Sequence, residues 1–118
     1  MTKEELKKRT KAFGIATVKF ARTLPHDPIT THFAVQLVKS ATSVGANYRS
    51  ACRAKSGADF ISKMATAEEE GDEALLWFEV LVETETARKE TVATLMDEAD
   101  QLVRIIVASI NTARDGSR

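Results

Sequence analysis

The amino-acid sequence predicts an all-α protein that folds as an antiparallel up-down-up-down four-helix bundle. The chain has 118 residues with only five glycines and two prolines, and 6% of its residues are aromatic, so turn and strand formers are scarce. Apolar residues recur at steps of three and four along four successive segments, as on amphipathic helices. The breaks between these segments are short, which favours antiparallel neighbours. We therefore expect a single domain over residues 1–118.

The first helix is predicted over residues 3–23. Thr2 and Glu5 form a capping-box pattern, in which a hydroxyl and a carboxylate accept from free amides at the start of a helix. The apolar positions of this helix lie seven residues apart and are Leu6, Phe13 and Phe20. Pro25 and Pro28 end the helix and frame the first loop.

The second helix is predicted over residues 29–55 and contains the unusual stretch SVGANYRSACRA, residues 43–54. Its core positions are Phe33, Leu37, Ala41, Val44, Tyr48 and Ala51. Gly45 inside a helix costs about 1 kcal/mol relative to alanine, and close approach of another helix is the usual compensation. At 100° per residue, Asn47 lies on the shoulder of the core, and Lys39, Arg49 and Arg53 lie on the opposite face. This helix is therefore predicted to serve the bundle core and a second contact, with protein or RNA.

The third and fourth helices are predicted over residues 58–88 and 90–114. The sequence SGAD, residues 56–59, breaks the second helix and caps the third. The apolar stripe of the third helix is Phe60, Met64, Ala67, Gly71, Leu75, Phe78 and Leu81. The stripe of the fourth is Val92, Leu95, Ala99, Leu102, Ile106, Ile110 and Ala113. Both patterns keep the helical period for nearly six turns, so two long helices close the bundle.

Charge is distributed unevenly along a chain whose formal net charge is zero. Residues 1–22 hold seven Lys or Arg against two Glu, whereas residues 64–100 hold two against twelve Asp or Glu. Such asymmetry indicates either charge pairing between helices or subunits, or a basic surface for an anionic partner. The candidate contacts for a nucleic acid or another partner are Lys7, Lys8, Lys11, Lys39, Arg49 and Arg53.

The sequence holds no pattern that indicates a catalytic, cofactor or metal site, so we expect no enzymatic activity. The glycines are scattered and form no phosphate-binding loop. Neither His26 nor His32 has a glutamate three residues before it, as the di-iron pattern of helix bundles needs. Cys52 is interpreted as a packing residue. For the acidic cluster at residues 68–73, pairing with arginines of a neighbouring helix is favoured over a divalent-metal site.

The same chain indicates a cytoplasmic protein with no membrane segment. It has one cysteine, which excludes an internal disulfide and fits a reducing compartment. No apolar run approaches the roughly 20 residues of a membrane span. The first ten residues are charged throughout and are unlike a signal peptide.

Three motifs in order carry a resemblance to a known family. They comprise Ser43, Val44 and Asn47, then Ser56, Asp59 and Phe60, then Glu70, Glu73 and Trp77. With these motifs, residues 37–81 resemble the four-helix-bundle family first named for proteins encoded in intervening sequences of bacterial 23S ribosomal RNA genes. Ser50 stands where relatives carry a glutamate, so an ion pair from that glutamate is not expected here.

The resemblance implies a homopentamer with a central channel. The chain is also similar to the accessory variability determinant of diversity-generating retroelements, a pentamer that binds a reverse transcriptase and nucleic acid through a basic surface. The interface candidates are Ser43, Gly45, Asn47, Tyr48, Asp59, Phe60, Glu70, Glu73 and Trp77. The hypotheses are therefore a non-catalytic homo-oligomer that binds RNA or a nucleic-acid-processing protein, or a purely structural scaffold of charge-paired subunits. In the scaffold, Arg49 and Arg53 would meet carboxylates of another subunit.

Overall fold

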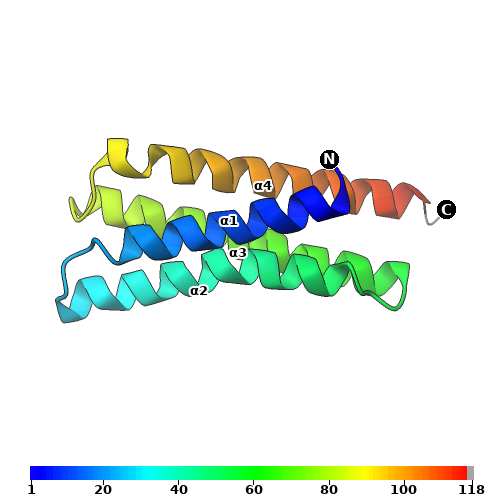
Figure 1. The fold of residues 1–118 in the computed structure, drawn as a ribbon, viewed down its shortest axis with the longest axis horizontal. Helices are drawn as coiled ribbons and strands as arrows, with labels where there is room; N and C mark the ends of the chain where they lie inside the picture. The colour runs from blue at the N-terminus through cyan, green and yellow to red at the C-terminus, as the bar shows by residue number, and fades with distance from the viewer. Residues whose placement is uncertain (117–118) are drawn as a thin grey trace.

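The computed structural model describes residues 1–116 and confirms the all-α four-helix fold. The helices are α1 (Lys3–Ala21), α2 (Pro28–Ala51), α3 (Gly57–Glu83) and α4 (Lys89–Gly116). They run up, down, up and down in a body 50 Å long and about 22 Å wide (Figure 1). No strand occurs among residues 1–116, and no helix there is long and apolar enough to cross a membrane.

Side-chain caps define where the helices begin. The Thr2 hydroxyl accepts from the Glu5 amide, and the Glu5 carboxylate accepts from the Thr2 amide, which confirms the predicted capping box. At the start of α2, the Asp27 carboxylate accepts from the Thr30 amide at 2.9 Å, and this bond lowers the pKa of Asp27. The adjacent Pro28 occupies the first turn, where its missing N–H costs nothing.

Three of the helices end earlier than the sequence predicted. α1 ends at Ala21 rather than residue 23, and α2 ends at Ala51 rather than residue 55, because Ser56 adopts an extended backbone to cap α3. α3 ends at Glu83 rather than residue 88, because Glu85 turns into the left-handed region with φ of 59°. The Thr86 amide then donates to the Leu81 carbonyl, as in a Schellman motif. Only glycine adopts this backbone without cost, so a glycine would have indicated the turn. Glu85 stands there instead, and the sequence pattern therefore did not indicate it.

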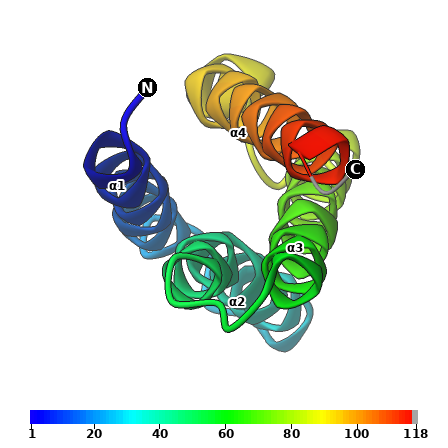
Figure 2. The ribbon, with the colours of Figure 1, turned by 90° about the vertical axis from the view of Figure 1, so that its right-hand side faces the viewer.

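The helices pack mainly on their neighbours in sequence. α1 lies on α2, α2 on α3 and α3 on α4, whereas α1 and α4 contact each other sparingly (Figure 2). The Arg9 guanidinium joins α1 to α4 by donating two bonds of 2.7 Å to the Glu98 carboxylate and a third to Gln101. Among residues 1–116 this is the only ion pair between two helices. Bidentate geometry makes it stronger than an ordinary surface pair.

Two glycines lie in the close contact between α1 and α2. Gly14 lies against Thr42, and Gly45 lies against Thr10. A methyl group on Gly45 would stand 3.4 Å from the Thr10 hydroxyl and 3.5 Å from its carbonyl carbon, which is ordinary contact. The helix that the sequence predicted beside Gly45 is therefore α1 of the same chain. Gly71 is more confined, because its added Cβ would stand 2.6 Å from Cγ2 of Val103 on α4.

These contacts predict opposite effects for two matched substitutions. Gly45→Ala should raise the free energy of unfolding by up to about 1 kcal/mol, because alanine is the better helix former and its methyl group fits. Gly71→Ala should lower it by about 1–3 kcal/mol, because Val103 is stiff on a helix and cannot turn aside. Urea unfolding followed by circular dichroism measures both changes. A shift in the same direction for both variants would contradict the packing described.

Candidate functional site

A groove along the seam between α1 and α2 gathers cationic side chains, and we call it the cationic groove. It has a volume of about 420 Å³. Its charged lining consists of Lys7, Lys11, Lys19, Arg22 and Arg49. Its remaining lining is small or apolar and consists of Thr10, Gly14, Ile15, Val18, Thr42, Gly45 and Ala46. Because Gly14 and Gly45 have no side chains, the floor of the groove is low between the longer cationic side chains.

A second groove continues along the same seam toward the loop between α1 and α2, and we call it the apolar groove. It has a volume of about 760 Å³. It shares Val18 and Arg22 with the cationic groove. Its other lining residues are Ala21, Leu24, Pro25, His26, Thr31, Ala34, Val35, Val38 and Lys39. Val35, one of its apolar lining residues, is 57% exposed.

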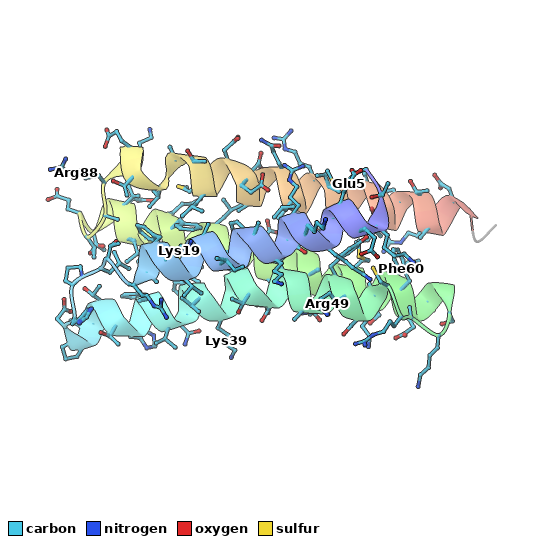
Figure 3. All side chains as sticks on the ribbon, in the orientation of Figure 1. Glu5, Lys19, Lys39, Arg49, Phe60 and Arg88 are labelled. Carbon is cyan, nitrogen blue, oxygen red and sulfur yellow. The ribbon has the colours of Figure 1, made fainter. Side chains whose placement is uncertain are left out.

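The structure brings together four of the six predicted cationic contacts. Lys7, Lys11 and Arg49 line the cationic groove, and Lys39 lines the apolar groove beside it. Figure 3 labels Lys19 on α1 and Arg49 on α2 near this seam, and Lys39 at the lower edge of α2. Lys8 and Arg53 are exposed and line neither groove.

Lys19 and Arg22 were missing from the predicted set although both line the cationic groove. The helical period places Arg22 on the side of Lys11, because eleven residues turn an α-helix by about 20° beyond whole turns, and Lys19 lies about 80° from Lys11. The sequence pattern did not show which face of α1 would lie beside α2. That choice follows from the small residues of α2 at the seam.

The first motif of the resemblance supports the packing of α2. Tyr48, which follows this motif directly, is buried, and its burial and its hydrogen bond with Cys52 raise the pKa of the Tyr48 hydroxyl. The Asn47 amide donates to the Ser43 carbonyl one turn earlier at 2.9 Å. Both side chains are thus engaged within α2 and its core contacts.

The second motif caps α3. The Ser56 hydroxyl accepts from the Asp59 amide, and the Asp59 carboxylate accepts from the Lys55 amide at 3.1 Å. Lys63 lies 3.7 Å from the same carboxylate, one turn along the helix. Phe60 packs half-buried against the core. Asp59 therefore serves the helix start within this chain.

The third motif leaves two buried polar atoms without a hydrogen-bond partner among residues 1–116. They are Oε2 of Glu70 and Nε1 of Trp77, seven residues apart on α3. The Trp77 ring contacts Phe33 of α2 at a centroid distance of 5.7 Å. Desolvation raises the pKa of Glu70, the charges of Glu73 and Glu69 raise it further, and the charge of Lys39 lowers it.

The predicted pairing of the acidic cluster with arginines is not found within the chain. No residue of 68–73 forms an ion pair with an arginine in the part of the chain that the structure describes. The nearest cationic influence on the cluster is Lys39, whose charge acts on Glu70. In the same part of the chain, no three histidine, cysteine or carboxylate side chains are grouped closely enough to hold a metal ion.

Glu70 makes the stability of the fold depend on pH. The pKa of Glu70 is raised in the folded state, so its charged form at neutral pH lowers the free energy of unfolding. This loss of stability decreases as the pH falls from the raised pKa toward the ordinary pKa of a glutamate. Glu70→Gln should therefore raise the melting temperature at pH 7. The difference from the unchanged protein should shrink as pH is lowered toward 4. Thermal melts across this range measure it, with Glu79→Gln as control, because Glu79 is exposed and does not act on the pKa of Glu70. A constant difference at every pH would contradict the burial of this carboxylate.

Comparison with known proteins agrees with this fold. A crystal structure of a protein of unknown function from the S23 ribosomal protein family of Bacteroides thetaiotaomicron matches with a TM-score of 0.87 and 28% sequence identity. The match covers 94% of this chain and 99% of that protein. No functionally curated protein matches the chain. A family model described as 23S rRNA-intervening sequence protein matches residues 2–108. The chain therefore belongs to the 23S rRNA-intervening sequence protein family.

Proposed function

We propose that the protein is a non-catalytic, self-associating protein of the cytoplasm that binds RNA through the cationic groove. The observation that carries this proposal is the charge of the groove lining. Five cations line it, and no Asp or Glu is among the lining residues. A uniformly cationic groove raises the local concentration of polyanions and binds their phosphates.

The spacing of the cations suits an extended anionic chain. Lys7 and Lys19 are twelve residues apart on α1, which corresponds to about 18 Å along the helix axis. Arg49 approaches from α2 on the other wall of the groove. Cations on both walls over this length can contact several consecutive phosphates of one RNA strand. A compact cluster of lysines would not extend along the strand in this way.

Recognition by this groove is expected to depend little on base sequence. No aromatic side chain lines it, so it offers no platform on which a base can stack. Its cations contact phosphates, and phosphate contacts fix position without reading bases. The groove therefore supports a role in holding RNA or a nucleoprotein, with specificity supplied by RNA shape or a second protein.

Self-association is the second part of the proposal. It is supported by the family resemblance and by the segregation of charge between helices. α1 and α2 together carry eight Lys or Arg against two Glu, whereas α3 carries eight carboxylates and one Lys. A scaffold of charge-paired subunits that binds no RNA is the alternative that the same segregation supports.

The RNA-binding proposal predicts a salt-dependent affinity. Labelled RNA should bind with a dissociation constant that rises steeply between about 50 and 200 mM salt, because each phosphate contact releases a counterion. The double variant Lys11→Glu with Arg49→Glu should weaken binding at low salt by about tenfold or more and flatten the salt dependence. Fluorescence anisotropy measures both quantities.

The matched control is Lys89→Glu with Arg104→Glu, which changes the net charge equally on α4, away from the groove. This control should retain most of the affinity. Equal losses in both double variants would show attraction to overall charge rather than to the groove. Absence of binding at about 50 mM salt would overturn the RNA proposal and favour the scaffold alternative.

A further inference from the structure

The apolar groove is exposed, although its composition is that of a contact surface. Val35 at 57% exposure stands at its edge, and Leu24, Pro25 and Val38 extend the apolar lining. The cations on its margins are Arg22 and Lys39, and no carboxylate lines it. Neither cation forms an ion pair within residues 1–116. A complementary partner surface for the apolar groove would therefore carry an apolar side chain flanked by carboxylates.

The chain presents such a surface on the outer face of α3, which we call the acidic ridge. It consists of Glu69, Asp72, Leu76, Glu79 and Glu83. These residues follow one another at steps of three and four and form one exposed stripe along about 21 Å of helix. Leu76 is 47% exposed at the centre of the stripe. No carboxylate of the ridge forms an ion pair within the described chain.

The ridge and the groove are complementary but cannot meet within one molecule. Figure 2 places α3 on the side of α2 that faces away from α1, so the two surfaces point in different directions. We infer that the acidic ridge of one copy docks into the apolar groove of a second copy, with Leu76 against Val35 and the carboxylates near Arg22 and Lys39. This inference rests on the proposed self-association and names the two surfaces that produce it.

Such a contact is heterologous, because each copy offers a groove to one neighbour and a ridge to another. Repetition of a heterologous contact gives a closed ring when the rotation between copies closes, and a filament when it does not. Apolar contact at the centre and charge pairs at the margin are the usual anatomy of a specific protein interface. The cationic groove stays open in this arrangement except at Arg22, which borders both grooves.

A charge-swap experiment on the full chain tests the two surfaces. The groove variant carries Arg22→Glu and Lys39→Glu, and the ridge variant carries Asp72→Lys and Glu79→Lys. Each variant alone should be monomeric by light scattering after size exclusion, because like charges then face each other. An equimolar mixture should associate again, because each variant now offers the surface that the other lacks. The control Lys89→Glu with Arg104→Glu should keep the mass of the unchanged protein.

A second variant tests the apolar part of the contact. Leu76→Asp removes the apolar contact at an exposed position and should raise the dissociation constant by about tenfold or more. Circular dichroism should show unchanged helix content in every variant.

The outcomes separate this inference from the proposed function. If the unchanged protein is monomeric, self-association itself is wrong. If it is oligomeric and both charge variants keep its mass, another interface assembles it and the ridge-to-groove contact is wrong. If each variant is monomeric but the mixture does not associate, the two surfaces do not face each other and the inference is also wrong. If RNA binding fails while the mixture associates, the docking surfaces stand and only the RNA proposal is lost.

Discussion

The close approach of α1 to α2 is the contact on which the rest of the surface depends. Gly14 and Gly45 lie in this contact, against Thr42 and Thr10. The approach of the two helices brings the lysines of α1 and the arginine of α2 to the same groove. Glycine weakens a helix, so these two positions exchange some local stability for a shallow floor between charged walls. The uniform charge of the lining is thus a consequence of backbone packing as well as of composition.

Much of the fold could be predicted from the sequence, because its determinants are local. The capping box at Thr2 and the period of the apolar residues are read from short windows, and both are found in the structure. The early end of α3 could not be predicted in this way. It depends on Glu85, which adopts the left-handed backbone conformation that glycine usually adopts at the end of a helix. No pattern in the sequence indicates that a glutamate takes this conformation.

The candidate site was predicted only in part, because it depends on which helix faces lie together. Of the predicted cations, Lys7, Lys11 and Arg49 line the cationic groove and Lys8 and Arg53 do not, whereas Lys19 and Arg22 line it without having been predicted. Net charge along the sequence indicates a basic half without indicating the geometry of its surface. The partner of Gly45 was similarly ambiguous, since a glycine predicts a close neighbour but not whether that neighbour belongs to the same chain.

The sparse contact between the first and last helices has a consequence for how the chain folds and opens. Because each helix packs mainly on the next one in sequence, most native contacts form between segments that are near neighbours, and such low contact order favours rapid folding. α1 is held by α2, by the Arg9 clamp to Glu98 across the bundle, and by Phe20, whose ring packs against Phe78 of α3. Its detachment would break these contacts, but no direct contact between α2 and α3 or between α3 and α4. Hydrogen exchange of the α1 amides therefore reports a partial unfolding that is separate from melting of the whole bundle.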